Sequence, residues 1–86
     1  MDKKICIITG ASSGIGHAAA MKFIANGYIV INGSRTDKKP ISSPDYEFIP
    51  TDVSKEDDVK NLFEKVIEKH GKIDVLINNA GLGLFA

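Results

Sequence analysis

The sequence predicts an α/β fold, the front half of a doubly wound sheet of about four parallel strands. Three observations indicate this fold. Short apolar runs alternate with longer segments of helical periodicity, a glycine-rich turn follows the first run, and asparagines follow the last. The element order β-α-β-loop-β-α-β then implies the spatial strand order 3-2-1-4, with two main helices.

The first strand and helix are joined by the glycine-rich turn. Residues Ile5–Ile8 form a continuous apolar run, which is typical of a strand buried on both faces of a parallel sheet. We expect a helix over Gly14–Asn26, ended by Gly27 at the C′ position. Its buried face is predicted from residues at helical spacing, namely Gly16, Ala19, Ala20, Phe23 and Ile24.

The second crossover is predicted to be a loop. A strand over Tyr28–Ile31 is closed by Gly33-Ser34-Arg35, and a third short strand is expected over Tyr46–Ile49. Between them, residues 36–45 are polar and contain two prolines, so they are too short and too interrupted for a full helix.

The clearest helix in the sequence is predicted over Ser54–His70. Ser54 is the expected N-cap, Asp57 three residues later resembles a capping box, and Gly71 ends the helix. The apolar stripe consists of Val59, Leu62, Phe63, Val66, Ile67 and His70. A fourth strand is expected at Ile73 and Val75–Ile77.

Composition narrows the function classes. The 86 residues make one small domain, and 11 basic residues balance 11 acidic ones, which argues against a nucleic-acid surface or a polybasic membrane anchor. The single cysteine, Cys6, lies in the first strand and is interpreted as a core residue. No apolar run has the length of a signal peptide or a membrane span, so we expect a cytoplasmic protein.

The part of the sequence that best indicates a function is the turn Thr9-Gly10-Ala11-Ser12-Ser13-Gly14-Ile15-Gly16. A strand, a glycine-rich turn and a helix N-terminus together bind a dinucleotide pyrophosphate through backbone N–H groups and the helix dipole. Gly10 supplies the turn, Gly14 leaves room for the pyrophosphate, and Gly16 lets the helix approach the sheet. Ser12 and Ser13 are candidates for hydrogen bonds to phosphate or ribose, or alternatively for loop capping.

Two further motifs follow predicted strands: Asp52-Val53 comes after the third strand and Asn78-Asn79-Ala80-Gly81 after the fourth. Together with the glycine-rich turn, they make the sequence resemble the short-chain dehydrogenase/reductase family. The resemblance covers essentially the whole chain but only the front part of the family's pattern. It implies a Rossmann fold and a nicotinamide dinucleotide. Asp52 would bind the adenine amino group, or else act as a turn residue. Asn79, Ala80 and Gly81 would lie along the ribose and nicotinamide, whereas Asn78 could instead clamp two strands.

The end of the second strand indicates which cofactor is bound. An NAD-selective site needs an acid about 20 residues beyond the glycines, and this segment has Ser34-Arg35 with no acid before Asp37. We therefore expect NADP(H), held at its 2′-phosphate by Arg35 with Ser34, although Arg35 could be a merely exposed loop residue. The predicted cofactor-binding residues are Gly10, Ser12, Ser13, Gly14, Ile15, Gly16, Ser34, Arg35, Asp52, Val53, Asn79, Ala80 and Gly81.

No catalytic or metal-ligating residue is assigned. The family's chemistry uses a Tyr-x-x-x-Lys pair, but Tyr28 is followed by Asn32 and Tyr46 by Pro50. His17 and His70 lack partners at the spacing of a metal site or a triad and are taken as structural.

The resulting prediction is an NADP(H)-dependent oxidoreductase acting on an alcohol or carbonyl compound. Residues 1–86 would be its NADP-binding amino-terminal part, inactive alone and prone to self-association, whereas the intact enzyme would be a homo-oligomer. The alternative is a non-enzymatic dinucleotide-binding or regulatory module. An in-frame Tyr-x-x-x-Lys downstream of codon 86 would favour the enzyme.

Overall fold

The computed structural model describes residues 3–11 and 14–79, which form one parallel sheet with the strand order β3-β2-β1-β4. The predicted α/β fold and strand order are confirmed. In chain order the elements are β1 (Ile5–Thr9), α1 (Gly14–Ala25), β2 (Ile29–Ser34), β3 (Tyr46–Pro50), α2 (Glu56–His70) and β4 (Val75–Asn78). No helix within the described ranges is both long and apolar enough to cross a membrane.

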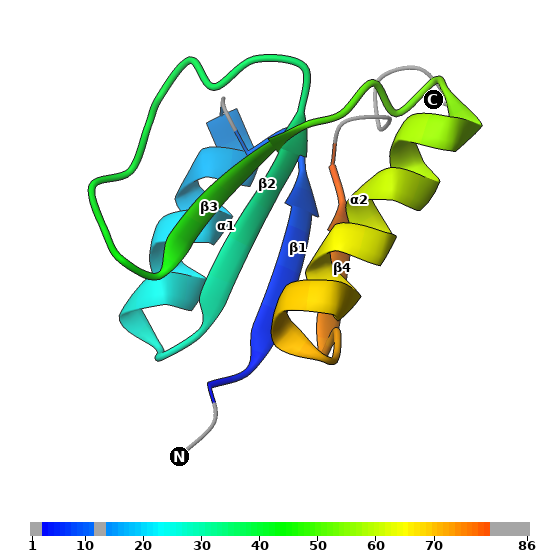
Figure 1. Ribbon diagram of the computed structural model, residues 1–86. Helices are drawn as coiled ribbons and strands as arrows, with labels where there is room; N and C mark the ends of the chain where they lie inside the picture. The colour runs from blue at the N-terminus through cyan, green and yellow to red at the C-terminus, as the bar shows by residue number, and fades with distance from the viewer. Residues whose placement is uncertain (1–2, 12–13, 80–86) are drawn as a thin grey trace.

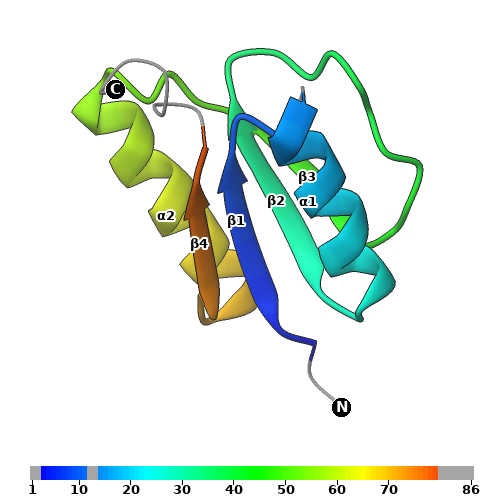
Figure 2. The same cartoon turned by 180° about the vertical axis from the view of Figure 1, so that it is seen from behind.

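The sheet is covered by one helix on each face (Figures 1 and 2). Residues alternate along β1, so Ile5 and Ile7 pack under α2 with Leu62 and Val66, while Cys6 and Ile8 belong to the cluster that contains Ala20 of α1. All five residues of β1 are buried, as expected for a central parallel strand. Burial raises the pKa of the Cys6 thiol to about 11, so this side chain is an unreactive core group.

The strand register brings the carboxyl ends of β1, β2 and β4 to the same edge of the sheet. Thr9, the last residue of β1, pairs with Gly33 on one side and Asn78 on the other. The N-terminus of α1 lies at this same edge, uppermost in Figure 1. The fold therefore gathers the glycine-rich turn and the ends of the strands into one region.

Strand β2 is longer than predicted. It continues through Asn32 and Gly33 to Ser34, because each of these residues pairs with β3 and the first two also pair with β1. A Cβ on Gly33 would lie 2.6 Å from Cδ2 of Leu62, so glycine here lets α2 sit close to the sheet. Asn32 and Gly33 are therefore buried within the strand, and the half-buried Ser34 is its last residue.

The predicted N-cap of the second helix was wrong. Helix α2 begins at Glu56 with Lys55 in the N-cap position, and no side chain caps it. The Ser54 hydroxyl instead donates to Oδ1 of Asp52 at 2.6 Å, and Asp58, rather than Asp57, reaches back to accept from the backbone N–H of Asp52 at 2.9 Å. The C-terminal prediction was right, since Gly71 has a φ of 79° and donates its N–H to Ile67.

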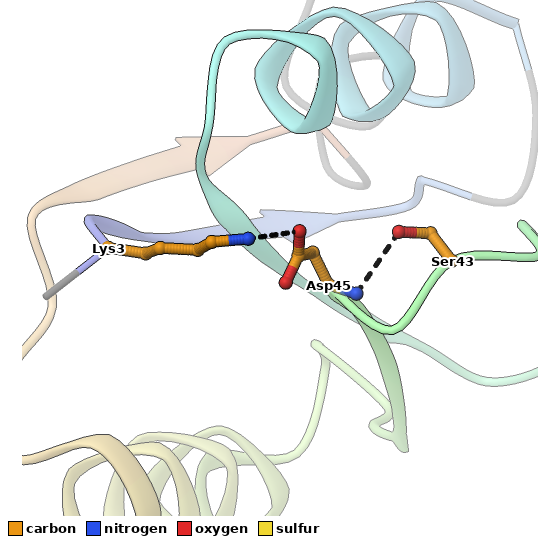
Figure 3. Close-up of polar contacts among 3 residues, drawn as sticks. All are labelled: Lys3, Ser43 and Asp45. Carbon is orange, nitrogen blue, oxygen red and sulfur yellow. Dashed lines mark hydrogen bonds and ion pairs between the residues drawn. The ribbon is translucent and has the colours of Figure 1, made fainter. Parts of the chain in front are cut away.

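The segment between β2 and β3 contains no helix, as predicted, and is fixed at its far end by Asp45. Lys3 Nζ and Asp45 Oδ2 lie 2.5 Å apart, and the Asp45 backbone N–H donates to the Ser43 hydroxyl at 3.0 Å (Figure 3). The Asp45 carbonyl accepts from the N–H of Val30 at 2.8 Å. These contacts attach the end of the loop to the start of β1 and to β2.

The opposite end of the sheet is closed by Asp74. Its Oδ2 accepts from the backbone N–H of Ile5 at 2.7 Å, while its own N–H donates to the Ile5 carbonyl at 2.9 Å. Among the described residues β4 is an edge strand, with Leu76 half exposed. The self-association expected from such an edge remains a prediction.

We predict that Asp74 makes the stability of the fold sensitive to acid. The hydrogen bond from Ile5, helped by Lys72, holds the pKa of Asp74 below its usual value. A carboxylate with a lowered folded-state pKa stabilises the fold above its unfolded pKa, near 3.9, and loses that contribution as pH falls through the folded value. Asp74→Asn should therefore flatten the decline of the free energy of unfolding below about pH 4, measured by urea denaturation.

The control for this experiment is Glu64→Gln, which changes an exposed acid on α2. An acid-induced decline that is as steep in Asp74→Asn as in Glu64→Gln would contradict the assignment.

Candidate cofactor-binding site

The glycine-rich turn adopts the backbone conformations that its glycines permit. Gly10 has a φ of 75° and Gly14 a φ of 52°, both in the left-handed region where a side chain is strained. A Cβ on Gly14 would meet no atom of the described residues within 4 Å, so these residues leave open space beside it. Ser12 and Ser13, predicted to contact phosphate or ribose, lie outside the described residues.

Gly16 lies where α1 comes closest to the ends of β1 and β4. A Cβ here would lie 2.4 Å from the Gly10 carbonyl oxygen and 2.6 Å from Nδ2 of Asn79. Both distances are shorter than real Cβ contacts, so only glycine allows α1 to start this close to the sheet. The prediction of close helix–sheet packing at Gly16 is thus confirmed.

The ends of β1 and β4 are joined by Thr9 and the two asparagines. The Thr9 hydroxyl donates to Oδ1 of Asn78 at 3.1 Å and accepts from the backbone N–H of Asn79 at 3.0 Å. Nδ2 of Asn79 donates to the Gly10 carbonyl at 3.1 Å. Asn78 is therefore a clamp between strands, one of the two roles considered for it. Ala80 and Gly81 lie outside the described residues.

A buried polar chain supports the turn from β2, and sequence reasoning missed it. Asn32 is fully buried, accepts from the backbone N–H of Ala11 at 3.1 Å, and donates from Nδ2 to the Tyr46 hydroxyl at 3.0 Å. Ala11 is also buried, so its N–H needs a partner inside the protein. The sequence signal was a polar residue directly after the apolar run of β2, and a buried polar group of this kind needs a hydrogen-bond partner.

Ser34 and Arg35 lie at the carboxyl end of β2. The Ser34 hydroxyl donates to the Thr36 carbonyl at 2.9 Å, which folds the chain back immediately after the strand. Arg35 is exposed, and its positive charge is close enough to Asp52 to help lower the pKa of that carboxyl group. The ends of β2 and β3 are thus brought together at the predicted site.

Asp52 follows β3 and forms a turn with Ser54. Oδ1 of Asp52 accepts from the Ser54 hydroxyl and, at 3.0 Å, from the Ser54 backbone N–H. These two hydrogen bonds are the main reason that the pKa of Asp52 is lowered. The turn role considered for Asp52 is therefore present, and it employs one of the two carboxylate oxygens. Val53 beside it is half-buried.

The N-terminus of α1 is suited to an anion. Its first turn contains no acidic residue, so nothing there neutralises the positive end of the helix dipole. Gly14 and Ile15 are exposed, and the Ile15 side chain is 79% exposed, an unusual environment for a large aliphatic group. The surface at this helix end can therefore be covered by a ligand that has both anionic and apolar parts.

The two histidines lie in different surroundings. His70 lies 3.0 Å from Glu47 and connects the end of α2 to β3, which fits the structural role expected for it. His17 follows Gly16 in α1, and its Nδ1 is buried without a hydrogen-bond partner among the described residues. Across the ranges that the structure describes, no three His, Cys, Asp or Glu side chains are grouped to hold a metal ion.

Comparison with known proteins identifies the family. The sequence model of the short-chain dehydrogenases matches residues 4–86. The chain belongs to the short-chain dehydrogenase/reductase family. Among curated relatives, it is 40% identical over 95% of its length to a 3-oxoacyl-[acyl-carrier-protein] reductase of Thermotoga maritima. It is 39% identical over 90% of its length to a putative ketoacyl reductase of granaticin polyketide synthesis from Streptomyces violaceoruber.

Solved structures of the family have the same fold. The ligand-free aldohexose dehydrogenase of Thermoplasma acidophilum matches 93% of the chain with a TM-score of 0.84 and 40% identity, and the match covers 30% of that enzyme. ElxO with NADP bound matches 93% of the chain with a TM-score of 0.84 and 38% identity, over 36% of its own length. The chain spans 37% and 33% of the two curated relatives named above, about a third of each.

We predict that Gly16→Ala destabilises the fold because its Cβ would collide with backbone and with Asn79. The expected loss is about 1–3 kcal/mol in the free energy of unfolding, the usual cost of an overpacked site. Ala18→Ser, at an exposed position of the same helix, should change stability by less than about 0.5 kcal/mol. Urea denaturation of both variants checks this, and equal small effects would show that α1 can move away from β1 without cost.

Proposed function

We propose that residues 1–86 form the NADP(H)-binding part of an oxidoreductase that transfers hydride to or from an alcohol or carbonyl compound. The observation that carries this proposal is the position of Arg35. It is exposed at the carboxyl end of β2, and no acid occupies residues 33–36. A guanidinium there pairs with the 2′-phosphate that distinguishes NADP from NAD, whereas a carboxylate would repel it.

The other binding roles follow from the site geometry. The pyrophosphate is proposed to lie over Gly10, Gly14 and Gly16, beside the open space at Gly14 and the unopposed positive end of the helix dipole. Ile15 is proposed to lie against the cofactor, which would cover its exposed side chain. Ser12 and Ser13 belong to the same turn, and hydrogen bonds from them to phosphate or ribose remain a proposal.

The adenine and nicotinamide ends are assigned to the ends of β3 and β4. Asp52 is proposed to accept from the adenine amino group through Oδ2, since Oδ1 already accepts from Ser54, with Val53 beside the ring. Asn79, Ala80 and Gly81 are proposed to follow the ribose toward the nicotinamide. Thr9 and Gly10 already hold Asn79 at the end of β4, which fixes where this path begins.

The bound nicotinamide would supply the hydride chemistry, and this chain's residues would hold the adenosine and pyrophosphate end. We assign no described side chain as proton donor. Residues 1–86 are therefore expected not to catalyse turnover on their own. Relatives support the reaction class, since they include ketoacyl reductases, but they include coenzyme complexes of both types. ElxO was solved with NADP, and a ketoacyl reductase of Brucella melitensis with NADH.

We predict that Arg35→Ala lowers affinity for NADPH by about 10- to 100-fold, because hydrogen bonds to charged groups contribute about 1.5–3 kcal/mol each. NADH lacks the 2′-phosphate, so its affinity should change little. Lys38→Ala removes an exposed positive charge three residues later and is the matched control. This prediction is checked by measuring the dissociation constants of both coenzymes through nicotinamide fluorescence, with the full gene product as the protein.

An equal loss for both coenzymes in Arg35→Ala, or a wild-type preference for NADH, would overturn the assignment of NADP(H).

A further inference from the structure

Three acids begin helix α2, and Asp58 differs from the other two. Glu56 and Asp57 are exposed, whereas Asp58 is half-buried and its Oδ2 accepts from the backbone N–H of Asp52 at 2.9 Å. All three acids suit the positive end of the helix dipole, but a hydrogen bond to a residue six positions earlier is a further role. Asp58 therefore attaches the first turn of α2 to the turn that follows β3.

Asp52 is held at every hydrogen-bonding atom but one. Its N–H donates to Asp58, and its carbonyl accepts from the backbone N–H of Lys55 at 2.9 Å. Oδ1 accepts from the hydroxyl of Ser54 at 2.6 Å and from the Ser54 backbone N–H at 3.0 Å. Oδ2 has no hydrogen-bond partner among the described residues, so it is the atom of Asp52 that a ligand can use.

The residue before Asp52 is attached to the end of β2. Thr51 is buried, and its backbone N–H donates to the Ser34 carbonyl at 2.8 Å. Asp52 is thus held from β2 through its neighbour and from α2 through Asp58. Because Arg35 directly follows Ser34, the proposed adenine and 2′-phosphate contacts begin at the same place in the fold.

The free oxygen of Asp52 requires a hydrogen-bond donor. Hydrogen bonds from Ser54 are the main cause that lowers the pKa of Asp52, and the charge of Arg35 contributes. The group is therefore a carboxylate at neutral pH, and a carboxylate only accepts hydrogen bonds. The 6-amino group of adenine is a donor, whereas the 6-oxo group of hypoxanthine is an acceptor and would be repelled. Oδ2 can therefore distinguish these two bases.

We propose that Asp58 is a positioning residue for adenine recognition, which holds the backbone of Asp52 so that Oδ2 faces the adenine amino group. This inference rests on the proposed function, because it takes the adenine to bind at Asp52. Removal of the Asp58 carboxylate leaves the Asp52 N–H without its partner and detaches the turn from α2, so the adenine contact weakens. Arg35 follows β2 directly, so its contact with the 2′-phosphate should persist.

The test compares NADP with nicotinamide hypoxanthine dinucleotide phosphate, which carries an oxo group in place of the adenine amino group. Dissociation constants are measured by calorimetry on the full gene product. The wild-type protein should prefer NADP by about tenfold or more, the usual effect of one hydrogen bond to a charged group. Asp58→Ala should lower this preference by about five- to tenfold. Asp58→Asn should retain it, because an amide oxygen can accept from the same N–H.

Two further variants separate the hydrogen bond from the charge. Asp57→Ala removes the same charge from the same helix turn and should leave the preference unchanged, because Asp57 is exposed. Asp58→Glu keeps the charge but displaces the carboxylate by one methylene group, so it should lower the preference in the same direction as Asp58→Ala.

The outcomes separate this inference from the proposed function. Equal weakening of both nucleotides in Asp58→Ala, or a preference unchanged in Asp58→Ala and Asp58→Glu, would overturn the inference and leave the proposed function intact. An equal loss of preference in Asp57→Ala would assign the effect to helix charge and would also overturn it. A wild-type protein without preference for adenine would contradict the adenine role of Asp52 and with it the inference, whereas Arg35→Ala would still test the 2′-phosphate contact. Absence of binding for both nucleotides would overturn both proposals.

Discussion

The contact of α1 with the end of β1 is the constraint on which the site depends. Gly16 lies against the Gly10 carbonyl and Asn79, at distances that leave no room for a side chain. This contact places the positive end of the helix dipole beside the ends of β1 and β4. Because Thr9 also bonds both asparagines, the turn, the helix and β4 are held as one unit.

Buried polar side chains extend this unit to the other strands. Asn32 connects Ala11 in the turn to Tyr46 at the start of β3, so β1, β2 and β3 are joined at one place. Each of these groups has a hydrogen-bond partner, which is what makes a buried polar chain stabilising rather than costly. The open region is left at Gly14 and Ile15, where no acidic residue opposes an anion.

Patterns that repeat along the chain predicted most of the fold. Periodicity gave the six elements in order, and the apolar run of β1 predicted its central position, because only a strand covered on both faces buries every side chain. The errors arose at polar residues. The second strand was predicted to end at Ile31, just before Asn32, and Ser54 was predicted to be a helix cap. The partners that decide these two cases, Ala11 with Tyr46 and Asp52, can be identified only in the folded chain.

The site was predictable where it depends on glycines and less so where it depends on long-range partners. The spacing of Gly10, Gly14 and Gly16 follows from the turn itself, whereas the role of Asn32 depends on Ala11 and Tyr46, which lie in other segments of the chain. Arg35 was identified by its place after β2, and its proximity to Asp52 could not be read from the sequence.

The central claim is that the adenosine end of NADP(H) binds across the carboxyl ends of these strands. The most direct measurement is a titration of the ¹⁵N-labelled protein with adenosine 2′,5′-bisphosphate, followed by amide chemical shifts. The account predicts the largest changes at Gly14, Ile15, Gly16, Arg35 and Asp52. Changes centred instead on the surface hollow of α2 lined by Phe63, Glu64, Ile67 and Glu68, or no changes at all, would contradict it.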